Sequence, residues 1–110
     1  MERKQIVYIN EIKFVCDVVE NLCENNDIAC FTLQEVLDFT YLINDLKPSI
    51  VIIDEKLYSK EAQKFWSEVE AADHKCKTMI IGPQSEKFDY FHNGKIDVIT
   101  FGNILKNHLK

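Results

Sequence analysis

Hydrophobic and polar positions follow two different periods along the chain. Short apolar stretches rich in β-branched residues are typical of strands, and they alternate with stretches whose apolar positions recur at the helical spacing of 3.6. The pattern predicts strands at residues 5–9, 28–31, 50–53, 79–81 and 96–101. It predicts helices from Glu11, after a capping box formed by Thr32 and Glu35, after a cap at Ser59, within residues 84–95 and over Asn103 to Lys110.

This alternation indicates an α/β fold built on parallel strands. The run Ile50 to Ile53 is apolar at every position, which is typical of a central strand buried on both faces. Right-handed crossovers then favour a doubly wound fold of three layers. We expect a parallel five-stranded sheet in the order 2-1-3-4-5, with helices on both faces and function at the carboxyl ends of the strands.

Composition limits the class of protein further. The chain has 110 residues, which we expect to form a single domain over residues 1–110. A net charge of −5 argues against a general nucleic-acid-binding surface. No apolar run is long enough to span a membrane and no signal-peptide core follows Met1, so a cytoplasmic location is expected. The four cysteines show no metal-binding spacing and are expected to be buried, reduced thiols.

Two carboxylates fall at the predicted strand ends. Glu11 follows the first strand, directly after Asn10, and Asp54 follows the third. Because like charges brought together need a cation or a proton, a divalent metal is one interpretation. The other is that both acids lie at solvated strand ends and that Asn10 caps the next helix. The spacing alone leaves both open.

The stretch 48–57 resembles the third strand of a response-regulator receiver domain, the phosphoacceptor module of bacterial two-component signalling. Asp54 falls at the position of the phosphorylated aspartate, and the resemblance extends over nearly the whole chain. It implies the (βα)5 fold of receivers, which is flavodoxin-like.

The stretch 6–11 is similar to the first strand and acidic pair of that family. Asn10 falls at the first acid and Glu11 at the second. The resemblance implies a Mg²⁺ site formed by this pair, by Asp54 and by the backbone carbonyl of Lys56. Because an amide replaces one acid, metal binding is expected to be weak.

Three positions depart from the family's switch residues. Gly82 stands where a Thr or Ser is expected, and alignment of residues 97–102 with the fifth strand puts Phe101 at a lysine position and Val98 at the switch aromatic. Such a site lacks a charge-assisted bond to a phosphoryl group. Lys56 is either a partial substitute or an exposed loop lysine.

The resemblance and its departures lead to one main function hypothesis and two alternatives. The main one is a degenerate receiver that acts by protein–protein interaction, with weak or absent phosphorylation at Asp54. The alternatives are a Mg²⁺-dependent phosphoacceptor in a phosphorelay and a small flavodoxin-like ligand-binding domain. An enzyme is not expected, because no nucleophile–base pair is visible.

The expected partners are a histidine kinase or a downstream signalling protein, with neither nucleic acid nor membrane. A homodimer through an apolar patch within residues 88–109 is also considered, against the alternative that these residues pack in the core.

Overall fold

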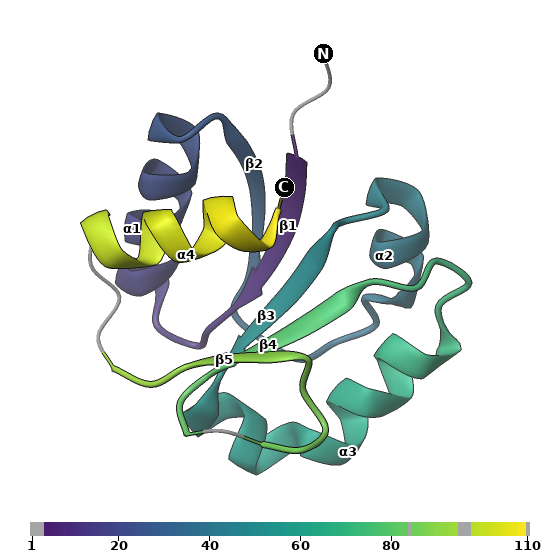
Figure 1. The fold of residues 1–110 in the computed structure, drawn as a ribbon. Helices are drawn as coiled ribbons and strands as arrows, with labels where there is room; N and C mark the ends of the chain where they lie inside the picture. The colour runs from purple at the N-terminus through teal and green to yellow at the C-terminus, as the bar shows by residue number, and fades with distance from the viewer. Residues whose placement is uncertain (1–3, 84, 95–97, 110) are drawn as a thin grey trace.

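A computed structural model describes residues 4–83, 85–94 and 98–109, without the side chains of 98–100 and 104. Figure 1 shows five strands and their helices. The strands are β1 (Lys4–Ile9), β2 (Ile28–Leu33), β3 (Ile50–Asp54), β4 (Lys77–Ile81) and β5 (Tyr90–His92). The helices are α1 (Lys13–Asn25), α2 (Thr40–Leu46), α3 (Glu55–Ala71) and α4 (Val98–His108).

The five strands form one sheet in the order β2-β1-β3-β4-β5, and every pair in it is parallel. The predicted strand order is therefore confirmed. β3 lies in the middle because all four of its apolar residues are buried, Ile50 and Ile52 on one face and Val51 and Ile53 on the other.

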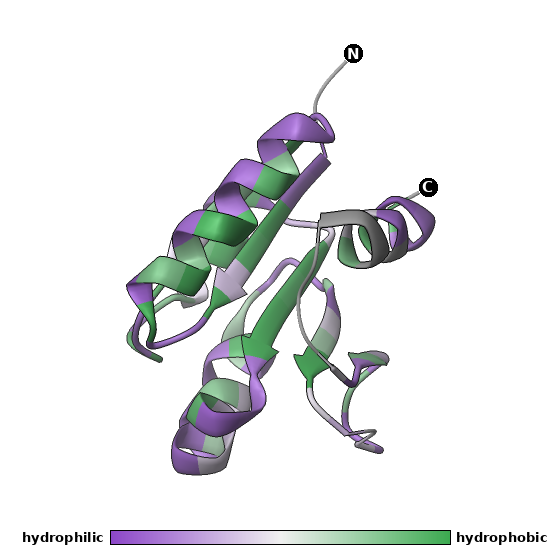
Figure 2. Cartoon of the chain, turned by 90° about the vertical axis from the view of Figure 1, so that its left-hand side faces the viewer, coloured by the Kyte–Doolittle hydropathy of each residue, from purple (hydrophilic) through white to green (hydrophobic). Residues whose placement is uncertain are grey.

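Two hydrophobic cores cover the two faces of the sheet. The core that contains Ile52 is closed by α1 and α4, and the core that contains Ile53 is closed by α2 and α3 (Figure 1). The strands between the helices are strongly hydrophobic (Figure 2). This three-layer arrangement is the one that the alternating pattern predicted. Within the described ranges, no helix has both the length and the apolar character needed to cross a membrane.

The start of α2 differs from the prediction. β2 continues to Leu33, so Thr32 and Glu35 do not form a capping box, and the helix begins only at Thr40. Its cap comes from another helix. One carboxylate oxygen of Glu68 in α3 accepts hydrogen bonds from the backbone N–H of Phe39 at 2.7 Å and from that of Thr40 at 3.1 Å. A cap supplied across the fold leaves no local signal in the sequence.

The start of α3 also differs. Ser59 was predicted to cap this helix, but α3 begins directly after β3 and Asp54 is its N-cap. Ser59 lies inside the helix, where its hydroxyl donates to the carbonyl of Lys56 at 2.8 Å. An aspartate is as good an N-cap as a serine, so the residue type at position 54 suits this role.

The largest correction concerns the last part of the chain. Within residues 84–95 a helix was predicted, but the described residues there form turns followed by β5. The strand predicted over residues 96–101 is wrong, because α4 begins at Val98; Ile96 and Asp97 lie outside the described residues. Phe101, Leu105 and Leu109 recur at helical spacing and are all buried against α1 and the sheet.

The apolar patch predicted for a homodimer is mostly part of the core. Phe88, Phe101, Leu105 and Leu109 are buried, whereas Phe91 remains 46% exposed. The surface available for the dimer is thus much smaller than expected, and the dimer stays a prediction.

Candidate functional site

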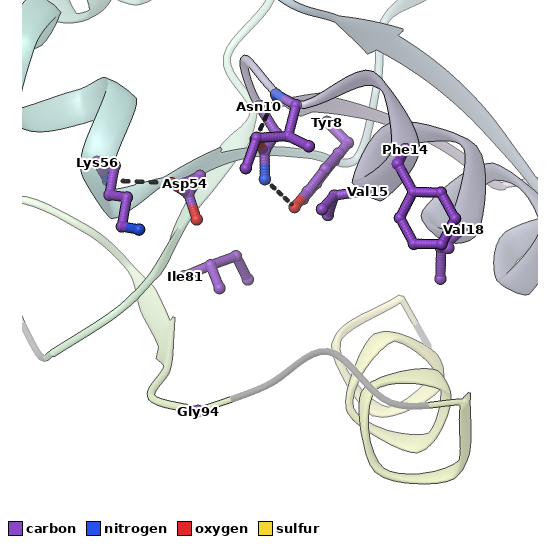
Figure 3. Close-up of a pocket in the computed structure, with 10 residues that line it drawn as sticks. Tyr8, Asn10, Phe14, Val15, Val18, Asp54, Lys56, Ile81 and Gly94 are labelled. Carbon is purple, nitrogen blue, oxygen red and sulfur yellow. Dashed lines mark hydrogen bonds between the residues drawn. The ribbon is translucent and has the colours of Figure 1, made fainter.

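Asp54 lies at the carboxyl end of β3, where the sheet meets the first turn of α3. One of its carboxylate oxygens, Oδ2, accepts a hydrogen bond from the backbone N–H of Lys56 at 3.0 Å (Figure 3). This bond satisfies one of the free N–H groups at the start of a helix, where a negative charge is also favoured by the helix dipole. Asp54 therefore has a structural role at the start of α3.

A buried chain of hydrogen bonds lies beside Asp54, at the end of β1. Asn10 donates from its amide nitrogen to the hydroxyl of Tyr8 at 3.0 Å and accepts from the backbone N–H of Ile12 at 2.9 Å (Figure 3). Burial raises the pKa of the Tyr8 hydroxyl, and the negative charge of Asp54 raises it further. Tyr8 therefore stays neutral, and both ends of the Asn10 amide are engaged within the protein.

Glu11 does not face Asp54. Its two carboxylate oxygens each lie 3.2 Å from the ammonium group of Lys60 on α3. Glu11 lines a hollow with Gln34 and Lys64 that is separate from the hollow lined by Asp54. Glu11 was expected to share a cation with Asp54. In the structure it is paired with Lys60 instead.

Asp54 opens onto a cavity of about 370 Å³ at the carboxyl edge of the sheet (Figure 3). Its polar lining is provided by Tyr8, Asn10, Asp54 and Lys56, and Asp54 is the only carboxylate among the lining residues. The other lining residues are Ile12, Phe14, Val15, Val18, Ile81 and Gly94. Among the described residues, the cavity thus has one anionic group, one lysine and largely apolar walls.

The residues expected to bind Mg²⁺ do not fit that ion in this arrangement. Mg²⁺ prefers several oxygen ligands in an octahedral arrangement. Here Glu11 is paired with Lys60, the Asn10 oxygen accepts from Ile12, and the Lys56 carbonyl accepts from a serine hydroxyl. Among the residues that the structure describes, no group of three His, Cys, Asp or Glu side chains could hold a metal ion. Of the carboxylates that the structure describes, Asp54 is the one that lines the cavity.

Gly82, at the expected hydroxyl position, packs closely against Glu55. A Cβ atom at position 82 would lie 2.8 Å from Glu55 Cβ and 2.7 Å from Glu55 Oε2. The space that a threonine or serine would need is therefore filled by the first residue of α3.

The other two predicted switch positions are not on the fifth strand. Val98 is the first residue of α4, and Phe101 is fully buried in that helix, 5.5 Å from the His92 ring between ring centres. The assignment of Phe101 to the lysine position is therefore wrong. β5 ends at His92, and Lys95, which follows it in the sequence, lies outside the described residues.

Three contributors to this site were missed by the sequence analysis: Tyr8, Glu55 and Lys60. Tyr8 had a signal, since a hydroxyl two residues before Asn10 in a strand lies on the same face as Asn10. Lys60 and Glu55 had none, because their contacts join segments that are far apart in the sequence.

Comparisons with known proteins identify the fold. No protein-family model and no curated protein matches this sequence. Solved structures do match over nearly the whole chain. A CheY-like response regulator receiver domain from Methylobacillus flagellatus is similar with a TM-score of 0.77 at 15% identity, over 96% of this chain and 98% of its own.

Two other solved structures are similar over nearly the whole chain. An orphan response regulator of H. pylori has a TM-score of 0.77 at 12% identity, over 99% of this chain and 98% of its own. The pseudo-receiver domain of the CikA protein has a TM-score of 0.74 at 11% identity, over 96% of this chain and 93% of its own. The chain has the fold of response-regulator receiver domains.

Proposed function

We propose that residues 1–110 form one receiver-like signalling domain that acts mainly by binding other proteins, and that phosphorylation of Asp54 is weak or absent. The single observation that carries this proposal is the pairing of Glu11 with Lys60, which removes the second carboxylate from the Asp54 cavity. Without that carboxylate, a divalent ion has too few ligands beside Asp54 to offset the charge of a phosphoryl group.

The contacts around Asp54 and Gly82 support the same proposal. The Asp54 carboxylate already caps α3, and Glu55 fills the space beside Gly82 where a hydroxyl would stand. A two-state switch responds only as far as its ligand prefers one state. A phosphoryl group at Asp54 finds no hydroxyl at position 82, so the response is expected to stay local.

The proposal includes the setting in which the domain acts. Its partners are a histidine kinase or a downstream signalling protein, its location is cytoplasmic, and it has no enzymatic activity of its own. The pseudo-receiver and orphan-regulator descriptions of two similar structures support a degenerate receiver.

A working phosphoacceptor is the second candidate, and one observation favours it. Asp54 stands at the carboxyl end of β3 with the side chain of Lys56 lining the same cavity (Figure 3). Lys56 supplies a positive charge near the acceptor, which would partly offset a phosphoryl group.

Acetyl phosphate treatment with Mg²⁺ distinguishes the two candidates. Intact mass measures the modification, and the Asp54→Asn variant shows whether it depends on Asp54. We expect little modification of the native protein, with amide shifts confined to the neighbourhood of Asp54. Stoichiometric modification with concerted shifts through β5 and α4 would establish the working phosphoacceptor instead.

A pair of lysine variants tests whether the Glu11–Lys60 ion pair is what keeps metal binding and phosphorylation weak. Lys60→Met releases Glu11, so Mg²⁺ binding and modification should both increase, whereas Lys64→Met removes a charge from an exposed position on the same helix without releasing Glu11. Equal behaviour of the two variants would show that the Glu11–Lys60 pair does not limit the site.

A further inference from the structure

The charges of this chain are distributed very unevenly. Residues 14–46 contain seven acidic residues and no lysine, arginine or histidine, whereas the rest of the chain has thirteen lysine and arginine residues and eleven acidic residues. The acidic stretch forms nearly all of α1, all of β2 and all of α2. Because β2 is the last strand of the sheet on its side, the negative charge is concentrated toward one edge of the molecule.

The same edge has an apolar surface that the fold leaves uncovered. A hollow of about 210 Å³ lies there, and Asp38 is its one charged lining residue. Its other lining residues are Phe31, Leu33, Leu37, Phe39, Tyr41 and Leu42. Phe31 is 45% exposed, Leu37 56% and Tyr41 70%. We call these three residues, with Leu33 and Leu42, the β2–α2 surface.

The late start of α2 explains why this surface is open. Phe31 pairs with Val7 and Leu33 with Ile9 in the sheet, so both point toward the face that α2 and α3 cover. α2 has only seven residues and begins at Thr40, so the outer part of that face stays uncovered. Exposed apolar residues grouped in this way commonly mark an interaction site.

We propose that the β2–α2 surface binds an amphipathic segment of a partner protein, in which apolar side chains are flanked by lysine or arginine. The apolar side chains occupy the hollow, and the basic side chains face Asp38 in its lining and the other carboxylates of the acidic stretch. This inference deepens the proposed interaction function, but it does not depend on the chemistry of Asp54.

Charge complementarity selects this occupant over three others. A second copy of the chain docked through the same surface would bring two acidic edges together. A nucleic acid and an anionic membrane would both be repelled by seven carboxylates without a basic residue among them. A basic amphipathic segment is attracted by the charge and buries the exposed apolar side chains.

Titration with a short synthetic peptide that alternates lysine with leucine and phenylalanine tests the proposal. We expect amide shifts to cluster at residues 30–33 and 37–42, and we expect affinity to fall as salt is added. A matched peptide with glutamate in place of lysine should not bind. Shifts centred on the Asp54 cavity, or equal binding of the glutamate peptide, would overturn the proposal.

Point variants locate the site. Tyr41→Lys should weaken peptide binding by about tenfold or more, which is the loss expected for an aromatic anchor at an interface. Asn21→Lys is the control, because it adds the same charge within the acidic stretch at an exposed residue that lines neither this hollow nor the Asp54 cavity. Equal losses in both variants would show that only net charge matters.

Two further measurements distinguish the proposed peptide site from self-association and from the chemistry of Asp54. Sedimentation of the native protein and of Tyr41→Lys should show the same oligomeric state in both low and high salt; a dimer that Tyr41→Lys dissociates would identify a second copy as the occupant and overturn the proposal. Asp54→Asn should bind the peptide as tightly as the native protein. Failure of the peptide to bind would refute this surface while leaving the acetyl phosphate result as a separate test of the receiver-like function.

Discussion

Asp54 shows at the scale of one residue that a candidate phosphoacceptor is also a structural residue. Its carboxylate caps α3, so removal of the side chain and removal of the charge have different consequences. Asp54→Ala should lower the free energy of unfolding by about 0.5–2 kcal/mol, because the backbone N–H of Lys56 loses its acceptor. Asp54→Asn keeps an oxygen at the same place and should cost much less. Urea denaturation of both variants measures the difference, and equal losses would rule out the cap.

Gly82 is constrained by a close neighbour in addition to its positive φ of 157°. Gly82→Ser should lower the free energy of unfolding by about 1–3 kcal/mol, because the added Cβ would overlap the Glu55 side chain close to the backbone. Gly94→Ser is the matched control, since Gly94 also has a positive φ but no atom within 4 Å of the added Cβ. If both variants lose the same amount in urea denaturation, backbone conformation and not the Glu55 contact determines the cost.

The residue scale is also where sequence reasoning reached part of the site. It placed Asn10 and Asp54 correctly at neighbouring strand ends, because the ends of parallel strands follow from their order. It did not predict that Lys60 binds Glu11, since the partners are 49 positions apart and nothing in a local pattern encodes that distance.

At the scale of elements, the strands of the first four-fifths of the chain were predictable and the last part was not. β3 has only apolar residues before Asp54, so a buried strand is the one assignment that fits this stretch. The apolar residues at the start of the stretch 96–109 suit a strand, and those later in it suit a helix. Which of the two forms depends on packing against the rest of the fold. Asp89 contributes to this packing. Its carboxylate accepts a hydrogen bond from the backbone N–H of Thr78 at 2.8 Å, which holds the chain beside β4 directly before β5.

The link between α2 and α3 gives a prediction at this scale. Glu68 accepts hydrogen bonds from two backbone N–H groups at the start of α2 and from the Thr40 hydroxyl. Glu68→Ala should lower the free energy of unfolding by about 1–2 kcal/mol through the loss of this cap. It should also speed amide hydrogen exchange at Phe39 and Thr40.

Glu70→Ala is the control for that experiment. Glu70 is on the same helix and is exposed, and its side chain makes none of these contacts. Unchanged exchange at Thr40 in Glu68→Ala, or the same stability loss in Glu70→Ala, would show that α2 starts at Thr40 for another reason.

At the scale of the whole molecule, the strand order followed from chain order and handedness, whereas the distribution of charge had to be seen on the fold. The net charge of −5 does not reveal that residues 14–46 and the rest of the chain differ strongly in charge. Only when α1, β2 and α2 are placed at one edge does the lack of basic residues over positions 14–46 become a property of a surface.

That distribution predicts a stabilising variant. Glu24 is exposed in the last turn of α1, four residues after Glu20, and the turn has no basic residue. Glu24→Lys should raise the free energy of unfolding by about 0.3–1 kcal/mol in low salt, because it removes a like-charge repulsion and places a cation at the helix C-terminus. The gain should shrink as salt is added. Glu86→Lys, outside the acidic stretch, should gain less; an equal gain would mean that only net charge counts.

The length of α3 has a consequence for communication across the molecule. Two helical segments make up α3: the first begins with Asp54 as its cap, and the second carries the Glu68 carboxylate that accepts hydrogen bonds from the start of α2. They meet at Glu61, whose backbone departs from helical geometry (φ −131°, ψ 27°), so a kink lies between the Asp54 cavity and the β2–α2 surface. Amide exchange at Thr40 in Asp54→Ala measures whether the two segments of α3 are coupled. Faster exchange would show that a change at the start of α3 reaches α2, and unchanged exchange would show that the change does not extend beyond the kink.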